Sequence, residues 1–281
     1  MKEKVLIVGC GDLGQHVAFT LTKSGIHSIG LRRQACASNQ VMEMVYADVT
    51  QPASLQLLEK MHPTIVIYCV AATAQTDQNY YSHYVDGLKN VLNALTNTDV
   101  LRHVFFVSST RMYGQSSNAL MDEMMTPVPQ DFGGSRLLEA EKLLDQPHQK
   151  WRGTALRLTG IYGPGREYMI NLARDPSKWP LKNSWTNRIH RDDAAAFIVH
   201  LIKRLINNLP VDECYVVTDS HPVSQYEVLR WMADKMGVSV DGRLPEVVGG
   251  KRMSNQRMLS TGFSLEYPDY QTGYLSLLPK A

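Results

Sequence analysis

The sequence predicts an α/β protein whose first 160 residues form a doubly wound parallel sheet. Strand-like and helix-like segments alternate over these residues. Strands that are separated by helices pair in parallel, with right-handed crossovers between them. In addition, the wholly apolar run at residues 5–8 ends in a glycine-rich turn, which is typical of a strand buried on both faces.

Periodicity places the elements of this first region in order. The apolar residues Leu13, Val17 and Leu21 recur at helical spacing after the first strand, and Gly25 ends that helix. A long helix over residues 80–95 is expected because its apolar side chains form one stripe. Further helices are expected at 53–60 and 135–144. The six expected strands cover residues 5–8, 26–31, 43–47, 65–68, 103–107 and 154–158.

Glycines and prolines interrupt this pattern after residue 158. A helix over 193–205, a strand over 214–217 and a helix over 224–236 are expected beyond the interruption. We therefore predict a dinucleotide-binding domain over residues 1–160 that also includes 189–218. Residues 161–188 and 219–281 are expected to form a smaller, partly interleaved C-terminal α/β region that binds the substrate.

Charge and composition exclude several classes of protein. Lys and Arg number 29 against 27 Asp and Glu, so the net charge of +2 gives no indication of a nucleic-acid partner. The longest apolar stretch, residues 65–74, is far shorter than the roughly 20 residues of a membrane span. The first residues lack the apolar segment of a signal peptide. We expect a cytoplasmic protein that binds neither nucleic acid nor membranes.

Cysteine and histidine spacing predicts no metal site. Cys10, Cys36, Cys69 and Cys214 are scattered and form no Cys-x-x-Cys pair, which favours free thiols in a reducing compartment. The nine histidines form no H-E-x-x-H or other ligand spacing.

A glycine-rich turn between the first strand and the first helix predicts dinucleotide binding. Residues 9–14 read G-x-G-x-x-G, in which the glycines allow a tight turn, close approach of a diphosphate and close helix packing. The N-terminus of the helix then offers free N–H groups and a partial positive charge. The residues expected to contact the cofactor here are Gly9, Gly11, Asp12, Leu13 and Gly14.

The end of the second strand favours NADP over NAD. An acidic residue at this position binds the ribose 2′-hydroxyl of NAD, whereas an arginine accommodates the 2′-phosphate of NADP. Arg32 and Arg33 stand there, with no acid nearby. The alternative is that both are solvated surface arginines. Asp48 and Val49 follow the third strand, where they either contact adenine or form a turn.

Further motifs follow the glycine loop in a characteristic order. They are Asp48-Val49, Ala71-Ala72, residues 85–92, residues 108–114 (SSTRMYG), residues 156–165, residues 187–193 (NRIHRDD) and residues 267–270. Together they resemble the extended short-chain dehydrogenases/reductases, the NAD(P)-dependent epimerases and dehydratases that act on nucleotide sugars. The resemblance implies that Asp48 and Val49 contact adenine and that Ala71 and Ala72 line the cofactor path. It also implies that Ser109 binds the reacting oxygen and that Tyr113 lines the substrate pocket.

The chain departs from this family at the residues that transfer protons. The catalytic Tyr-x-x-x-Lys falls on Phe132 and Arg136, and Tyr84 replaces the usual asparagine three residues before Gly87. A phenylalanine has no ionisable proton, and losing a positioned acid or base typically removes 10²–10⁴-fold of rate. Arg136 retains a positive charge and is expected to hold a ribose hydroxyl of the cofactor.

Several residues are candidates for the remaining chemistry. Tyr113 and Asp131 are candidate substitute acids, although a packed aromatic and a helix cap are the alternatives. The resemblance places Arg166 and Arg188 where the anionic part of a sugar nucleotide binds, and Arg157 is a weaker candidate. His190 either contacts the substrate or packs at the start of a helix.

Two functions from different classes fit these observations. The first is an enzyme that uses NADP, or else NAD, for hydride transfer, epimerisation or dehydration of a small polar substrate such as a sugar nucleotide. The second is a non-catalytic dinucleotide sensor or scaffold, which the losses at Phe132 and Arg136 motivate. A homodimer is also predicted, with Tyr80, Tyr81 and Tyr84 as exposed anchors on the helix over 80–95, although a buried stripe is equally consistent.

Overall fold

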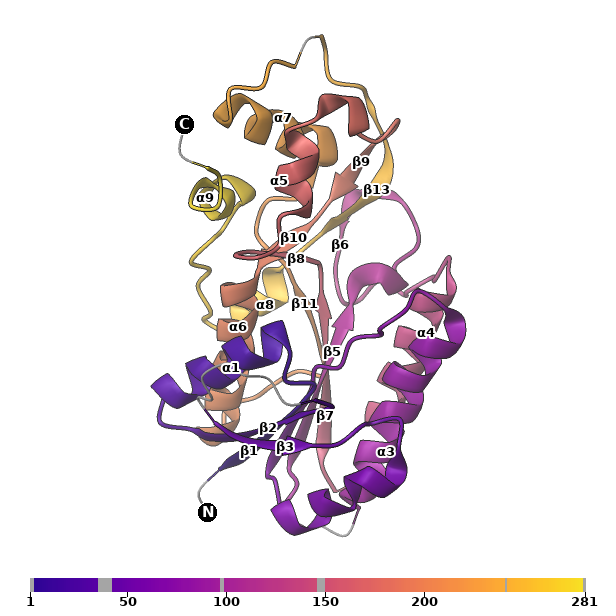
Figure 1. Cartoon of the computed structure of the whole chain (residues 1–281), viewed down its shortest axis with the longest axis vertical. Helices are drawn as coiled ribbons and strands as arrows, with labels where there is room; N and C mark the ends of the chain where they lie inside the picture. The colour runs from indigo at the N-terminus through magenta and orange to yellow at the C-terminus, as the bar shows by residue number, and fades with distance from the viewer. Residues whose placement is uncertain (1–2, 35–41, 97–98, 146–149, 241, 280–281) are drawn as a thin grey trace. The chain divides into compact units, whose positions relative to one another are not determined.

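The computed structural model describes residues 3–34, 42–96, 99–145, 150–240 and 242–279 (Figure 1). The chain divides into two compact units. The first comprises residues 1–114, 127–157 and 195–215, and the second comprises 115–126, 158–194 and 216–281. Cys36 lies outside the described residues. No helix in the described ranges is long and apolar enough to cross a membrane.

A seven-stranded sheet confirms the predicted doubly wound α/β fold. Its strand order is β11-β7-β5-β4-β1-β2-β3, and the printed register pairs β1 in parallel with both β2 and β4. The order runs outward in opposite directions from β1 and β4, which defines a topological switch point where ligands bind in such folds. The strands are β1 (Lys4–Val8), β2 (His27–Arg32), β3 (Glu43–Tyr46), β4 (Ile65–Tyr68), β5 (His103–Ser109), β7 (Arg152–Leu158) and β11 (Cys214–Val217).

Helices cover both faces of this sheet. Helix α1 (Asp12–Lys23) lies on one side, whereas α3 (Gly87–Ala94) and α4 (Phe132–Glu141) lie on the other (Figure 1). All four residues of β4 are buried, as expected for a strand covered on both faces. Helix α6 (Arg191–Ile206) includes the segment expected over 193–205.

The structure has a helical segment from residue 77 to residue 94 where a long helix was predicted over residues 80–95, but its middle is a π-helix rather than an α-helix. Helix α2 (Asp77–Tyr80) is followed by a π-helix, η2 (Tyr81–Asp86), before α3 begins. The Tyr68 hydroxyl donates to the His83 carbonyl within this wide turn, and a Cβ at Gly87 would collide with that hydroxyl. A side chain that inserts into a helix in this way disturbs its regular hydrogen bonds. The helix expected at 53–60 is instead the 3₁₀-helix η1 (Pro52–Met61).

The second unit contains elements that its sequence did not predict. A four-stranded sheet has the order β12-β9-β13-β6, and β8 pairs with β10 in parallel. Residues 115–126 belong to this unit because β6 pairs with β13. The strands are β6 (Ser117–Met121), β8 (Gly160–Tyr162), β9 (Asn183–Thr186), β10 (Arg188–His190), β12 (Val223–Ser224) and β13 (Val247–Met253).

Helices α5 (Tyr168–Ala173) and α7 (Gln225–Lys235) pack against each other in this unit. Their apolar side chains join Tyr162, Trp179 and Tyr274 in one buried cluster. The unit also contains α8 (Gln256–Ser260), α9 (Tyr270–Leu275) and the short 3₁₀-helix η5 (Pro176–Lys178). The first unit contains the short 3₁₀-helices η3 (Thr110–Met112) and η4 (Lys142–Leu144).

Candidate dinucleotide-binding site and the residues around it

Two glycines of the loop between β1 and α1 are required by close backbone contacts. Gly9 has a φ of +90°, and a Cβ there would lie 2.6 Å from the Val70 amide nitrogen. A Cβ at Gly14 would lie 2.8 Å from the Gly9 carbonyl oxygen. The loop is tied to β2, because the amides of Gly9 and Cys10 both donate to the Leu31 carbonyl at 2.9 Å. These contacts hold the turn against the ends of β2 and β4.

The remaining glycine of the motif, Gly11, has open space beside its Cα atom. It is the N-cap of α1, and no heavy atom lies within 4 Å of the position that a Cβ would occupy. No side chain caps this helix start, and the start of a helix favours an anion. Gly11 and Asp12 are exposed, whereas the side chain of Leu13 is buried. The loop therefore fits a diphosphate, which needs close approach to bare backbone.

The residues predicted to choose the cofactor lie at the ends of β2 and β3. Arg32 is partly buried and Arg33 is exposed. The Asp48 carboxylate accepts hydrogen bonds from the Thr50 amide at 2.9 Å and from its hydroxyl at 2.8 Å. Partial burial raises the pKa of Asp48, but these hydrogen bonds and the charge of Arg33 outweigh it and lower the pKa overall. Asp48 is therefore ionised at neutral pH, in a turn beside an arginine.

The segment that follows β4 is held by several polar contacts. The Asn79 side-chain oxygen accepts from the amides of Thr73 at 2.8 Å and Ala74 at 2.9 Å. The Ala72 amide donates to the Tyr84 hydroxyl. Ala71 is exposed and Ala72 is partly exposed.

Ser109 ends β5 and caps the short helix that follows. Its hydroxyl accepts from the Arg111 amide at 3.2 Å and thereby caps η3. Arg111 then crosses the start of α4, where its guanidinium lies 2.9 Å from the Asp131 carboxylate. A Cβ at Gly133 would lie 2.5 Å from Arg111 Cζ, so this glycine makes room for the cation.

The structure pairs Arg136 with acidic side chains. Its guanidinium contacts Asp77 at 2.7 Å and Glu139 at 2.7 Å, and lies over the Tyr81 ring. A ribose hydroxyl would have to compete with both carboxylates for this cation. Phe132 packs its ring against that of Tyr80, with centroids 5.3 Å apart and planes at 86°. Tyr80 is only 6% exposed, so it is not the exposed dimer anchor that the sequence predicted.

Tyr113, one of the two candidate substitute acids, lies in the core of the first unit. Its side chain is fully buried, and its hydroxyl accepts from the Arg157 guanidinium. Arg157 also pairs with Glu141 at 2.7 Å, and both side chains are buried. Burial raises the pKa of Tyr113 to about 12, although the Arg157 charge opposes this. Asp131 is likewise engaged, because it accepts from the Gly134 amide at 2.7 Å as the cap of α4. Both residues therefore have structural partners.

The predicted substrate-binding residues lie in the second unit and differ in exposure. Arg166 is exposed in the loop after β8. His190 is buried between the rings of Tyr162 at 5.1 Å and Tyr267 at 3.9 Å, at the start of α6. This is the packed arrangement that the sequence left open. Arg188 is only 5% exposed, and its guanidinium donates to the Thr186 hydroxyl at 2.6 Å.

Asp219 is a buried acid that the sequence analysis missed. It follows β11, is 1% exposed and accepts from the His221 amide at 3.2 Å. One oxygen of this carboxylate and one terminal nitrogen of Arg188 have no hydrogen-bond partner among the described residues. Burial raises the pKa of Asp219 to about 7, although the Arg188 charge lowers it. A single aspartate in a loop carries no sequence signal, because its burial depends on the fold.

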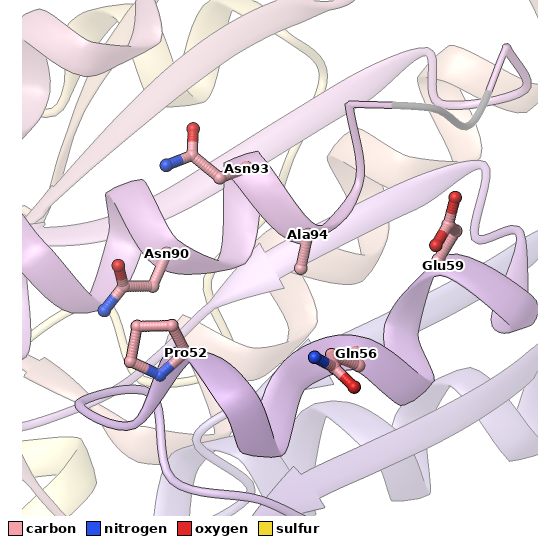
Figure 2. Close-up of a pocket in the computed structure, with 6 residues that line it drawn as sticks. All are labelled: Pro52, Gln56, Glu59, Asn90, Asn93 and Ala94. Atoms are coloured by element: carbon pink, nitrogen blue, oxygen red, sulfur yellow. The ribbon is translucent and has the colours of Figure 1, made fainter.

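A small open pocket lies elsewhere in the first unit (Figure 2). Its lining comes from η1 and α3, with a volume of about 260 Å³. The lining residues are Pro52, Gln56, Glu59, Asn90, Asn93 and Ala94. No residue predicted from the sequence to bind cofactor or substrate is among them.

The described residues contain no group of three His, Cys, Asp or Glu side chains that could hold a metal ion. Cys10, Cys69 and Cys214 are free thiols. Burial raises the pKa of the Cys10 thiol to about 11, so this thiol is protonated at neutral pH.

The parallel sheet, its switch point and the glycine loop define a Rossmann-type α/β protein. The chain belongs to the NAD dependent epimerase/dehydratase family, whose sequence pattern it matches over residues 5–211. The resemblance noted in the sequence is thereby confirmed.

Solved structures and curated proteins agree with this assignment. The chain is 46% identical to a proposed NAD-dependent epimerase/dehydratase from Methylobacillus flagellatus, with a TM-score of 0.91 and coverage of 99% of this chain and 98% of that one. UDP-N-acetylglucosamine 4-epimerase from Bacillus cereus shares the fold at 18% identity and a TM-score of 0.77, with coverage of 98% and 97%.

The curated relatives are more distant. The chain is 24% identical over 269 residues to short-chain dehydrogenase/reductase family 42E member 1 of Xenopus laevis, covering 84% of this chain and 68% of that protein. It is 23% identical over 178 residues to the sterol-4-alpha-carboxylate 3-dehydrogenase erg26 of Schizosaccharomyces pombe. That alignment covers 59% of this chain and spans about half of that protein, 52%.

Proposed function

We propose that this protein binds a nicotinamide dinucleotide at residues 9–14 and catalyses epimerisation, dehydration or hydride transfer on a sugar nucleotide. The observation that carries the proposal is the open space over Gly11 at an uncapped helix start, at the switch point of the sheet. The similarity of this fold to that of UDP-N-acetylglucosamine 4-epimerase supports a sugar nucleotide as the substrate.

Each half of the dinucleotide has residues suited to it. The amides at the start of α1 would hold the diphosphate, and Asp48 with Val49 would contact adenine. When bound, the nicotinamide supplies hydride-transfer chemistry. Ala71 and Ala72 would line its path, and Ser109 would orient the reacting oxygen while continuing to cap η3.

We propose NADP as the preferred cofactor, because Arg32 and Arg33 stand at the end of β2, where an acidic residue would favour NAD. Arg33 is exposed there. A guanidinium pairs well with a 2′-phosphate. We also propose that Arg166, Arg188 and His190 contribute to substrate binding in the second unit, although Arg188 and His190 are buried in this structure.

The second candidate function is a non-catalytic dinucleotide sensor. Phe132 has no hydroxyl, and both Tyr113 and Asp131 are held by structural partners. A sensor would bind the dinucleotide without consuming it, and its occupancy would control a partner surface such as the predicted homodimer interface.

Fluorescence titration with NADPH and NADH tests the binding. Gly11→Ala should fold normally, because nothing lies within 4 Å of the new Cβ. It should weaken binding by about 10- to 100-fold, since overpacking costs roughly 1–3 kcal/mol. Gly249→Ala is the matched control, because a Cβ there meets only ordinary contacts in the second unit. Equal affinities of Gly11→Ala and the wild type would refute the proposed phosphate site.

Two further measurements separate the alternatives. Replacing Arg32 and Arg33 with serine should weaken NADPH binding more than NADH binding, and an unchanged preference would remove the proposed role of these arginines. Incubation with UDP-sugars and either oxidised cofactor, followed by chromatography, tests for turnover. Stable cofactor binding without any product would favour the sensor over the enzyme.

A further inference from the structure

Phe132 lies in a chain of aromatic contacts that includes the phenols of Tyr80 and Tyr84. Its ring contacts that of Tyr80 at 5.3 Å, and the Tyr80 ring contacts that of Tyr84, also at 5.3 Å. Arg111 lies over the rings of Phe132 and Tyr80, with its Cζ atom 5.5 Å and 5.1 Å from their centroids. Two phenols, those of Tyr80 and Tyr84, therefore belong to the same cluster of rings as Phe132.

The hydroxyl of Tyr84 lies at the backbone that runs beside the glycine loop. It accepts the Ala72 amide, two residues beyond Val70. The Val70 amide nitrogen is the atom that a Cβ at Gly9 would approach to 2.6 Å. The Tyr84 phenol therefore contacts the segment after β4 whose residue Val70 packs against Gly9 of the proposed dinucleotide loop.

Tyr84 differs from the other phenols in this part of the unit by having a hydroxyl proton to give. Among the described residues, its hydroxyl accepts from Ala72 and has no acceptor of its own. The Tyr80 hydroxyl instead accepts from Arg111 at 2.7 Å and donates to the Gln75 side chain at 3.1 Å. The Tyr113 hydroxyl is in the core. Tyr84 is only partly buried, unlike Tyr80 and Tyr113.

The local backbone and the local charge are both unusual at Tyr84. The residue lies in the π-helix η2, a rare conformation that is often found at functional sites. Burial raises the pKa of its phenol above the ordinary value, whereas the Ala72 amide and the Arg111 charge oppose that rise. Asp131 and the space at Gly133 hold Arg111 in place.

We propose that Tyr84 is the acid–base residue that replaces the tyrosine lost at position 132. The proposal rests on the proposed function. When a substrate carbonyl becomes an alcohol, the Tyr84 phenol would give its proton to the carbonyl oxygen, and the carbonyl carbon would receive a hydride from the reduced dinucleotide of the proposed function. Both transfers reverse when the alcohol is oxidised again, so Tyr84 is regenerated as a phenol.

Fluorine NMR of protein labelled with 3-fluorotyrosine tests this role without requiring a substrate. The signal that is absent from the spectrum of Tyr84→Phe belongs to residue 84. If that variant does not fold, incorporation of 3-fluorotyrosine at residue 84 alone gives the same assignment. Saturating NAD⁺ should lower the titration midpoint of this signal by about one pH unit or more, because a positive charge nearby favours the phenolate. NADH, which lacks the nicotinamide charge, should not.

The Tyr113 signal, assigned with Tyr113→Phe, is the control and should not respond to NAD⁺, because Arg157 already binds that hydroxyl in the core. Binding of NAD⁺ without a change at residue 84 would overturn the role of Tyr84 and leave the proposed function standing. Failure of NAD⁺ and NADP⁺ to bind at all would overturn the proposed function.

Turnover supplies the second readout. Tyr84→Phe should lower turnover of a UDP-sugar by about 10²–10⁴-fold. Tyr226→Phe removes a phenol that donates to the Pro180 carbonyl in the second unit and should retain turnover. Full activity in Tyr84→Phe would refute the proposal.

Discussion

Asp219→Asn should abolish a pH dependence of stability that the wild-type protein carries between pH 5 and 8. Burial raises the pKa of this carboxyl from its ordinary 3.8 to about 7, and the nearby carboxylates of Asp269 and Asp193 add to the rise. Arg188 and the His221 amide act in the opposite direction. The folded protein therefore binds a proton that the unfolded chain releases.

The sign and size of the effect follow from that difference. Between pH 3.8 and about 7 the folded state holds one more proton than the unfolded state, so the free energy of unfolding falls as the pH rises. Each pKa unit corresponds to about 1.4 kcal/mol, and the carboxyl is half titrated at pH 7, so the wild type should lose about 2 kcal/mol relative to Asp219→Asn between pH 5 and 7. Above about pH 8 the difference between the two proteins should be constant.

Urea unfolding of both proteins at half-unit pH intervals measures this difference. Other titrating groups, including His103, contribute equally to both proteins and cancel in the subtraction. A wild type that gains stability over Asp219→Asn as the pH rises, or a difference that does not depend on pH, would show that Asp219 is ionised by Arg188 and refute the reasoning.

Two further predictions concern buried groups of the first unit. Burial, with the charges of Arg152 and Arg102, lowers the pKa of His103 to about 4, so its stabilising contribution should be lost as the pH falls from 6.5 to 4. Wild type should lose up to about 3 kcal/mol relative to His103→Asn in urea unfolding over this range, and parallel profiles would contradict the assignment. Glu141→Gln should lower the free energy of unfolding by about 3–5 kcal/mol, because it leaves the buried Arg157 without its carboxylate. Glu139→Gln, in the more exposed pair with Arg136, is the control and should change it by less than about 1 kcal/mol, so equal losses in the two variants would argue against a buried pair at Arg157.

Local patterns were sufficient to predict the parallel sheet of the first unit and the glycine-rich turn after its first strand. The apolar run that becomes β1, the helical spacing of Leu13, Val17 and Leu21, and the glycines between them are short-range signals. Each depends on a few consecutive residues, so the parallel sheet and its glycine-rich turn could be inferred without tertiary contacts.

The second unit was harder to predict because its strands are short and pair across long separations. Strand β6 lies at residues 117–121 but pairs with β13 at 247–253, and β12 has two residues. Such strands have too few residues to show alternation. The sequence therefore indicated only a looser region after residue 158 and missed the part contributed by 115–126.

The sequence by itself determined the doubly wound sheet, the glycine loop and the absence of a phenol at residue 132, because each is a matter of residue type and local order. Tertiary structure decided whether the side chains around them are buried and which groups they contact. Tyr113 is a core residue whose hydroxyl binds Arg157, and Tyr84 lies in a π-helix whose His83 carbonyl binds the Tyr68 hydroxyl. Such contacts join residues far apart in the chain, so only the folded arrangement could reveal which phenol is buried in the core and which is only partly buried.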